Sequence, residues 1–275
     1  MIRLAVRVRR ADADAALAEL LAFSPGGVEE VDAGADAVEY VLYGAEGELP
    51  SLPALRATVG DALVEVATSE IEDDWPQRWR SFHHPVEIAG ALRVRAPWHE
   101  PGAPGALLDL VIEPAQAFGT GAHATTRACL ELLVELAQAG LASGPLLDLG
   151  TGSGVLAIAA AALGYAPVLA VDNEPESVAA AAANAAANGV TIEVRALDVR
   201  SDPLPPAPTI AANLLAPLLV ALAGRLAPPP RLLIASGVLN EQAGAVADAF
   251  ATRQSMRVRA RRTIGDWTAL LFERG

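Results

Sequence analysis

Three glycines at alternate positions are the first feature of this 275-residue sequence that points to chemistry. The segment reads Asp148-Leu-Gly150-Thr-Gly152-Ser-Gly154 and joins an apolar stretch to an alanine-rich one. Glycines permit a tight turn and let the backbone approach a ligand without a Cβ clash. The dinucleotide fingerprint G-x-G-x-x-G would place its third glycine where this chain has Val155. The segment therefore predicts a ligand-binding turn that departs from the usual dinucleotide loop.

The same spacing, with an acid two residues before the first glycine, resembles the first motif of Rossmann-like S-adenosylmethionine-dependent methyltransferases. A sulfonium donor carries no pyrophosphate, so a helix N-terminus arranged for phosphate is not required. Asp172 follows the next apolar segment, where a carboxylate can accept both ribose hydroxyls of S-adenosylmethionine or of NAD. The alternative for Asp172 is a helix N-cap. From these residues alone, a NAD-binding oxidoreductase stays open beside a methyltransferase.

Two further polar residues lie where later strands are expected to end. Asp198 could reach an adenine amino group or could form a turn before Pro203. Asn213 ends an otherwise apolar strand, where its amide must find hydrogen-bond partners. Amino-methylating enzymes often place a short polar motif here, with an Asn carbonyl that receives the target amine. The alternative for Asn213 is an N-cap of the helix that follows.

The most specific segment is Ala117-Phe118-Gly-Thr-Gly-Ala-His123-Ala-Thr125-Thr126. It resembles the A-F-G-T-G-x-H-x-T-T signature of the ribosomal protein L11 methyltransferase family (PrmA type). Other segments match that family in order over residues 69–275, and they are Trp75, Trp79, Ala96-Pro97-Trp98, Asp148–Gly154, Asn213-Leu-Leu-Ala, Ser236–Leu239 and Gly265-Asp266-Trp267. The family's Pro-Gly before the signature is Pro114-Ala115 here, which alters a turn but removes no functional group.

This resemblance implies a protein N-methyltransferase that uses S-adenosylmethionine. Its expected acceptors are lysine ε-amino groups and the N-terminal α-amino group of ribosomal protein L11. The cofactor contacts that carry over are Thr126, Gly150, Asp172 and Asn213, with Phe118 and Gly152 as neighbours. Asn213 is also the expected catalytic residue. The alternative is a methyltransferase that acts on another protein or on a small-molecule amine.

The histidines and the cysteine predict no metal site. His123 is either a general base or a residue that orders the loop covering the cofactor, since methyl transfer to a neutral amine needs alignment more than a strong base. His83, His84 and His99 lack a cysteine or a spaced acidic partner with which to hold a metal ion. Cys129 is the only cysteine and is interpreted as a small buried side chain.

The elements that must position these residues follow from hydrophobic periodicity. Short apolar segments alternate with alanine-rich helical ones from residue 145 onward, which predicts a parallel, doubly wound sheet with its ligand site at the strands' carboxyl ends. The expected strands are 146–149, 168–171, 192–196, 210–212, 232–235, 256–261 and 267–273, and the expected helices are 155–163, 176–187, 217–226 and 241–252. The fold class is α/β, a Rossmann-like class I methyltransferase domain with a seven-stranded, mostly parallel sheet.

A small ferredoxin-like α+β domain is expected before it. Residues 2–9, 12–23, 28–32, 37–43, 52–59 and 62–68 follow the order β-α-β-β-α-β. The expected organisation is a ferredoxin-like substrate-recognition domain over 1–66, a helical linker over 67–85 and a methyltransferase domain over 86–275. Trp75, Trp79 and Phe82 have the spacing of one helix face within that linker.

Composition and charge limit the classes of partner and the cellular location that we expect. A net charge of −13 disfavours direct binding to a nucleic-acid backbone. The longest apolar run, Val155–Leu163, is too short to cross a membrane. Arginines interrupt the first apolar residues, so no signal peptide is expected, and a lone cysteine fits a reducing cytoplasm. Residues 1–66 hold five arginines and twelve acids, which indicates either a solvated surface or a basic partner.

Overall fold

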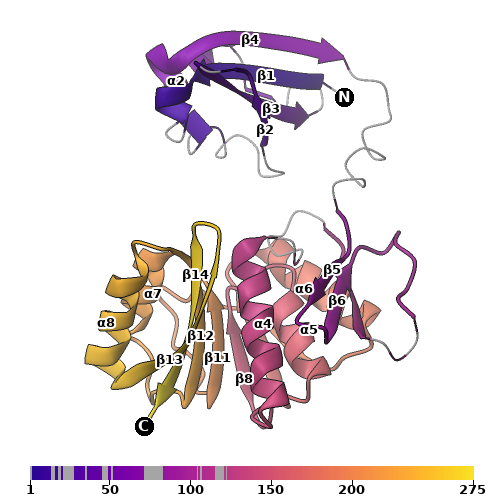
Figure 1. The fold of residues 1–275 in the computed structure, drawn as a ribbon, viewed down its shortest axis with the longest axis vertical. Coiled ribbons are helices and arrows are strands. Elements are labelled where there is room, and N and C mark those ends of the chain that lie inside the picture. The colour runs from indigo at the N-terminus through magenta and orange to yellow at the C-terminus, as the bar shows by residue number, and fades with distance from the viewer. Residues whose placement is uncertain are drawn as a thin grey trace. The chain divides into compact units, whose positions relative to one another are not determined.

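The protein is described by a computed structural model over residues 2–13, 16–17, 20, 28–34, 36–44, 49–50, 52–70, 83–103, 105, 107–114, 121 and 123–275. The chain divides into two compact units, Met1–Phe82 and His83–Gly275 (Figure 1). The first unit has one sheet and one hydrophobic core, and the second has two sheets and a core on each face of the larger one.

The first unit contains a four-stranded antiparallel sheet in the order β2-β3-β1-β4. Its strands are β1 (Ile2–Arg9), β2 (Glu29–Asp32), β3 (Ala37–Gly44) and β4 (Leu63–Glu70), and helix α2 spans Leu52–Val59. Strand β1 alternates apolar residues with arginines, so one face of the sheet is buried. Val6 and Val8 on that face share a core with Leu55 of α2. The strand order is that of a ferredoxin-like fold.

The boundary after this unit differs from the sequence-based expectation. Strand β4 continues to Glu70, because β1 pairs with it along its whole length and Ile2 lies opposite Glu70. Residues 67–70 therefore belong to the sheet and not to a linker. The expected linker helix with Trp75 and Trp79 lies outside the described residues.

The second unit is built on a seven-stranded sheet in the order β10-β9-β8-β11-β12-β14-β13. The strands are β8 (Leu146–Leu149), β9 (Val168–Asp172), β10 (Glu193–Ala196), β11 (Thr209–Asn213), β12 (Leu232–Leu239), β13 (Met256–Ile264) and β14 (Trp267–Arg274). The first five are parallel, and β14 and β13 complete the sheet as an antiparallel pair. Because β9 and β11 lie on opposite sides of β8, the strand order reverses there, which is where ligands bind in open α/β sheets.

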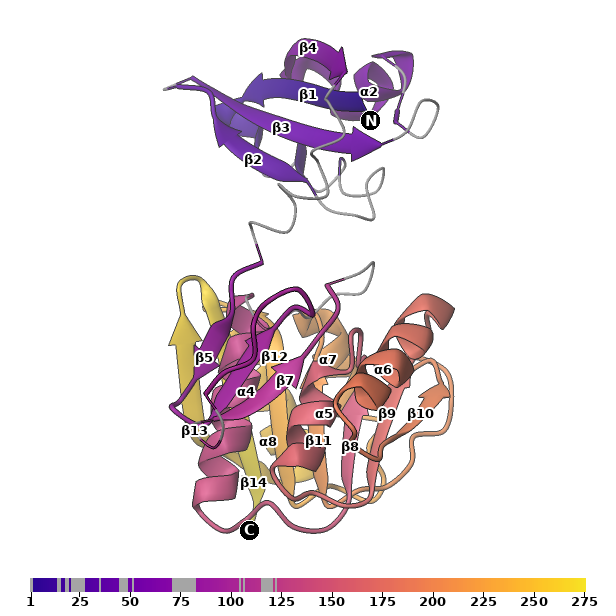
Figure 2. The same cartoon turned by 90° about the vertical axis from the view of Figure 1, so that its right-hand side faces the viewer.

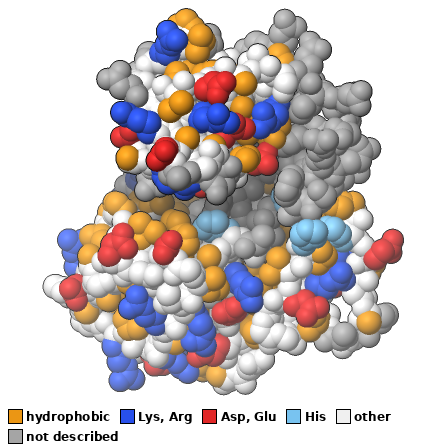
Figure 3. Space-filling model, turned by 45° about the horizontal axis from the view of Figure 1, so that its top comes forward, with side chains coloured by type: hydrophobic (Ala, Val, Ile, Leu, Met, Phe, Trp, Pro, Cys, Tyr) orange, Lys and Arg blue, Asp and Glu red, His pale blue; other side chains and the backbone are white. Residues whose placement is uncertain are grey.

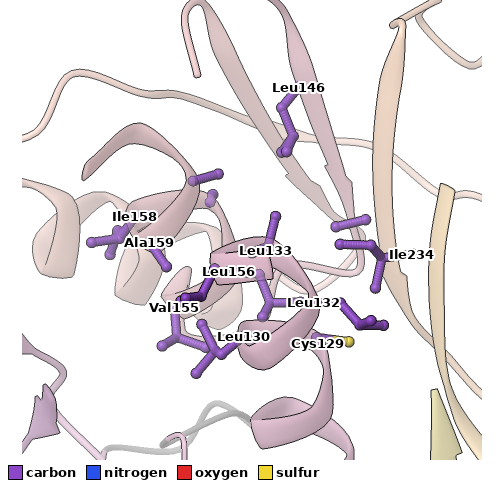
Figure 4. Packing of buried hydrophobic residues seen from close by; sticks show 14 of the residues in the cluster. Cys129, Leu130, Leu132, Leu133, Leu146, Val155, Leu156, Ile158, Ala159 and Ile234 are labelled. Atoms are coloured by element: carbon purple, nitrogen blue, oxygen red, sulfur yellow. The ribbon is translucent and has the colours of Figure 1, made fainter. Parts of the chain in front are cut away.

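Helices cover both faces of this sheet. They are α4 (Ala124–Gln138), α5 (Val155–Ala162), α6 (Pro175–Ala187), α7 (Ala216–Leu222) and α8 (Ala243–Gln254). Figure 1 shows α7 and α8 on one side of the strands and α4, α5 and α6 on the other. Successive strand residues enter opposite cores, as Leu146 and Leu147 do. Figure 4 shows Leu146 and Ile234 packed with residues of α4 and α5.

A separate three-stranded sheet precedes α4. It contains β5 (Val86–Ile88), β6 (Leu92–Arg95) and β7 (Leu108–Val111), which Figure 2 shows beside α4. Strands β5 and β6 pair antiparallel, and β7 pairs with β6 in parallel. The sequence analysis gave no strand at β7, because a segment of four residues is too short to show an alternation of apolar and polar positions.

The expected α/β class with a seven-stranded, mostly parallel sheet is confirmed. Most of the expected strands and helices of the second unit occur within three residues of their expected ends, whereas β12 and α7 differ by four. Within the described part of the chain, no helix has the length and apolar character needed to cross a membrane.

Candidate functional site

The glycine segment forms the turn between β8 and α5. Gly150, Gly152 and Gly154 all have positive φ angles, of 72°, 53° and 84°, a backbone region that disfavours side chains. A Cβ added at Gly150 would stand 2.5 Å from Leu214 Cδ2. One added at Gly154 would stand 3.0 Å from the backbone of Ala181. The turn therefore needs glycines both for its conformation and for close packing, at Gly150 against Leu214 and at Gly154 against Ala181 of α6.

Asp172 is the last residue of β9 and is brought to this turn. Its Oδ2 accepts a hydrogen bond from the backbone N–H of Gly152 at 2.9 Å, and its Oδ1 accepts one from Glu174 N–H at 3.1 Å. The side chain is 8% exposed. Each carboxylate oxygen has capacity for a second hydrogen bond. The arrangement fits a ligand with two neighbouring hydroxyls, such as the ribose of S-adenosylmethionine.

Asp148 lies fully buried beneath the same turn. Its Oδ2 accepts a hydrogen bond from Thr151 Oγ1 at 2.6 Å. Burial raises the pKa of Asp148 to about 7, although the hydrogen bond from Thr151 opposes that shift. The carboxyl group at the base of the turn is consequently close to its midpoint of ionisation at neutral pH.

Asn213 ends β11 on the other side of the strand-order reversal. Its Nδ2 donates to Thr126 Oγ1 at 3.3 Å and to Thr125 Oγ1 at 3.2 Å. Both threonines belong to the first turn of α4 and are almost fully buried. Thr126 and Asn213, two expected cofactor contacts that are 87 residues apart, are therefore neighbours. Leu214, which follows Asn213, contacts the glycine turn.

The N-terminus of α4 is fixed by its own polar contacts. His123 is the N-cap, and its Nδ1 accepts a hydrogen bond from the backbone N–H of Thr125 at 3.3 Å. Burial lowers the pKa of His123, so its ring is neutral at neutral pH. The ring stands edge to face with Trp267, with centroids 5.4 Å apart. Ser236 Oγ of β12 donates to the carbonyl of Thr125 at 3.1 Å.

Two asparagines that the sequence analysis did not single out join the glycine turn to the segment before the signature. Asn184 Nδ2 donates to the carbonyl of Ser153 at 2.8 Å, and its Oδ1 accepts from Glu113 N–H at 3.0 Å. Asn188 pairs with both backbone groups of Val111, at 2.8 and 2.7 Å. The sequence did contain a sign of them, because two asparagines four residues apart are unusual near the end of an alanine-rich helix.

The remaining candidates stand as follows. Asp198 is in a turn, where its carboxylate accepts a hydrogen bond from the backbone N–H of Arg200 at 2.9 Å and pairs with the Arg200 guanidinium. Phe118, expected beside the cofactor, lies outside the described residues. The structure thus brings together Gly150, Gly152 and Asp172 around one turn, and Thr126 with Asn213 beside it.

Comparison with known proteins agrees with this arrangement. The family model described as ribosomal protein L11 methyltransferase (PrmA) matches residues 45–275. The chain belongs to the ribosomal protein L11 methyltransferase family. It is therefore a methyltransferase whose methyl donor is S-adenosylmethionine. The alternative of a NAD-binding oxidoreductase is excluded.

Individual relatives of this family support the assignment. The ribosomal protein L11 methyltransferase of Geobacter metallireducens is 41% identical over 217 residues, which cover 74% of this chain and 67% of the relative. That of Pelobacter propionicus is 35% identical over 252 residues, covering 90% and 79%. The crystal structure of the ribosomal protein L11 methylase of Lactobacillus delbrueckii subsp. bulgaricus has a TM-score of 0.61 and 30% identity, and the match covers 70% of this chain and 99% of that one.

Proposed function

We propose that this protein transfers methyl groups from S-adenosylmethionine to ribosomal protein L11, at lysine ε-amino groups and at the N-terminal α-amino group. The substrate follows from the relatives, which are named for it. One observation carries the chemistry: the amide of Asn213 lies beside Thr126 at the carboxyl end of β11, next to the glycine turn. An amide oxygen at that point can accept a hydrogen bond from an amine.

The donor's contacts are assigned to five described residues, Thr126, Gly150, Gly152, Asp172 and Asn213, and to Phe118 outside the described part. When bound, S-adenosylmethionine supplies a methyl group on a positively charged sulfur. Asp172 would accept the ribose hydroxyls, while Gly150 and Gly152 let the backbone close on the ligand. The hydroxyl of Thr126 would donate a hydrogen bond to the methionine part of the donor. Its oxygen already accepts one from Asn213, so its proton is available for this contact. Phe118 is expected beside the donor through the family resemblance.

The acceptor amine must be neutral when its nitrogen attacks. A free lysine has a pKa of about 10.4, so near pH 7.5 only about one in a thousand is neutral. Forming that species costs roughly 4 kcal/mol, whereas an α-amino group with a pKa of about 7.7 needs almost nothing. A site beside a sulfonium favours the neutral amine through like-charge repulsion. Asn213 Oδ1 would then hold the amine through one of its N–H groups.

This account predicts different pH dependence for the two kinds of amine. Lysine methylation rises steeply with pH until the bound amine titrates, while α-amino methylation levels off earlier. Single-turnover rates from pH 6.5 to 10, resolved by site with mass spectrometry, test it. Identical profiles for the two amines contradict this selection.

Recognition of ribosomal protein L11 is assigned to the ferredoxin-like residues 1–66. Their excess of acids suits a basic partner. A fragment spanning 83–275, the second compact unit, should bind the donor with unchanged affinity but lose methylation of the full ribosomal protein. Equal methylation by the fragment and the whole chain rules this assignment out. The KM for the ribosomal protein should also rise with salt.

The decisive experiment is incubation of the purified protein with labelled donor and a mixture of ribosomal proteins. Label on ribosomal protein L11 alone supports the proposal, and label on a different protein or on a small amine supports the alternative acceptor. The acidic net charge of −13 favours free ribosomal protein over direct contact with RNA. A cytoplasmic location accords with this substrate and with buried, unbridged Cys129.

A further inference from the structure

A chain of hydrogen bonds with a fixed direction leads from the backbone of α4 to Asn213. It begins at the backbone N–H of Thr125, which points at His123 Nδ1. A backbone N–H is always a donor, so Nδ1 must be an acceptor, and the ring proton of a neutral His123 is then on Nε2. Burial of His123 lowers its pKa and keeps this neutral form.

The hydroxyl of Thr125 is the next member of this chain of hydrogen bonds. Its Oγ1 lies 2.8 Å from His123 Nδ1, and because Nδ1 accepts, the hydroxyl donates its only proton there. The oxygen can now only accept along this chain. Its other neighbour is the Asn213 amide at 3.2 Å, so the group facing Thr125 must be the donor, Nδ2. The second Nδ2 hydrogen faces Thr126 Oγ1 at 3.3 Å.

With both Nδ2 hydrogens engaged, the oxygen of the amide is oriented away from the threonines. Asn213 is partly exposed, and among the described residues no hydrogen bond reaches its Oδ1. We propose that His123 and Thr125 are positioning residues that fix the Asn213 amide with its oxygen toward the incoming amine. This rests on the proposed function for the identity of the acceptor. It gives His123 a task other than removing a proton.

The orientation matters because the two ends of an amide act oppositely on an amine. In the transfer, the lone pair of the amine nitrogen forms the new N–C bond while the C–S bond breaks and its electrons stay on sulfur. The resulting ammonium group then releases a proton to water. An amide oxygen binds an N–H of the amine and leaves the lone pair free. An amide NH₂ in the same place would donate to that lone pair and compete with attack.

The first test removes only the hydroxyl that transmits the direction. Thr125→Val should lower kcat at saturating donor at least tenfold while changing the Kd for S-adenosylmethionine by less than twofold. Thr125→Ser restores the hydroxyl and should recover most of kcat. Thr209→Val is the matched control, since Thr209 is a buried threonine at the far end of the same strand as Asn213. It should stay within twofold of the wild type.

Two outcomes of this test overturn the proposal. One is a Thr125→Val protein that is as active as Thr209→Val. The other is a defect confined to donor affinity, which would make Thr125 part of the donor site. Circular dichroism on each variant separates either result from unfolding. His123→Ala should share the kcat defect, and His123→Asn should recover part of it, because an asparagine side chain also accepts at an N-cap.

The second test needs no acceptor at all. Nitrogen-15 NMR of the imidazole rings in the donor-bound full chain reports which ring nitrogen carries the proton, and His123→Asn assigns the signals. A proton on Nε2 of His123 at pH 7.5 supports the chain of hydrogen bonds. A proton on Nδ1 overturns it, even if ribosomal protein L11 is methylated normally. Conversely, if the wild type methylates no ribosomal protein while the proton is on Nε2, the proposed substrate fails and the orientation stands.

Discussion

The two units of this protein differ in how many of their polar side chains are buried. In the described part of the chain, every buried polar or charged side chain belongs to the second unit, and these are Thr125, Thr126, Asp148, Thr151, Ser153, Asp172, Ser177, Asn184, Thr209, Ser236, Gln254 and Thr268. The described core of the first unit is apolar apart from the hydroxyl of Tyr40, which donates to a carbonyl. Its ion pairs, such as Arg7 with Glu39 and Glu65, are part-exposed.

The difference indicates two ways to use polar residues. Buried hydrogen bonds hold backbone and side chains in one arrangement, and losing a partner leaves an unsatisfied group that costs about 1–3 kcal/mol. Exposed ion pairs are worth about 0–1 kcal/mol and leave charge available to a partner. Figure 3 shows basic and acidic side chains interspersed on the first unit. The second unit thus fixes its geometry through buried polar side chains, which the described core of the first unit lacks apart from the hydroxyl of Tyr40.

The largest expected effect concerns the buried carboxyl of Asp148. Because its pKa in the fold is raised from 3.8 to about 7, the stability it contributes is fully present below pH 4 and is lost as the pH rises through 7. The free energy of unfolding should fall by about 4 kcal/mol across that window in the wild type. Asp148→Asn should remove this component. Urea unfolding at intervals from pH 4 to 8 measures it, and equal slopes in both proteins contradict the assignment.

Asn184 should have the next largest effect. Asn184→Ala leaves the carbonyl of Ser153 and the N–H of Glu113 without their buried partner. We expect a loss of about 2–4 kcal/mol in unfolding free energy and weaker donor binding. Gln138→Ala, an exposed amide at the end of α4, is the control and should change stability by less than about 0.5 kcal/mol. Equal stability of the two variants would show that the asparagine does not join these segments.

Asp172→Ala should weaken donor binding without unfolding the protein. Loss of charge-assisted hydrogen bonds to a ribose corresponds to roughly 1.5–3 kcal/mol, or about a 10- to 150-fold higher Kd. Calorimetry with S-adenosylmethionine measures the change, and Asp266→Ala, on an exposed turn, is the matched control. Unchanged affinity with intact circular dichroism rules out the ribose contact.

The smallest effect is expected in the first unit. Glu39→Gln removes the shared carboxylate of Arg3 and Arg7, whose side chains are 30% and 39% exposed. The unfolding free energy should change by less than about 1 kcal/mol, and less still at high salt. Thermal unfolding at two salt concentrations measures this. A loss above 2 kcal/mol would remove the contrast between the two units.

Most of the fold could be predicted from the sequence because its signals are local. Strand β8 occurs over the residues expected, 146–149, and α2 over 52–59. Strand β7 was not predicted, because it is short and forms by pairing with β6. The paired residues, such as Leu92 and Leu108, are 16 residues apart along the chain. Strand β4 ran past its expected end because the length of β1 decides how far the pair extends.

The candidate site divides in the same manner. Gly150, Gly152 and Asp172 could be predicted as candidates because residue type and place after a strand suffice to single them out. Asn184 was missed because its partners Ser153 and Glu113 are 31 and 71 residues away, and nothing in an alanine-rich helix says which segments will meet it.

The glycine turn, the alternation of strands and helices and the family were all predictable from the sequence, since each is carried by short segments of neighbouring residues. The contact of Asn213 with Thr125 and Thr126, which are 88 and 87 residues away, depends on the tertiary structure. The order of β8 and β11 in the sheet sets that meeting. The tertiary structure also decided which end of the amide faces the threonines, because the direction of a hydrogen bond depends on every donor that already surrounds its acceptor.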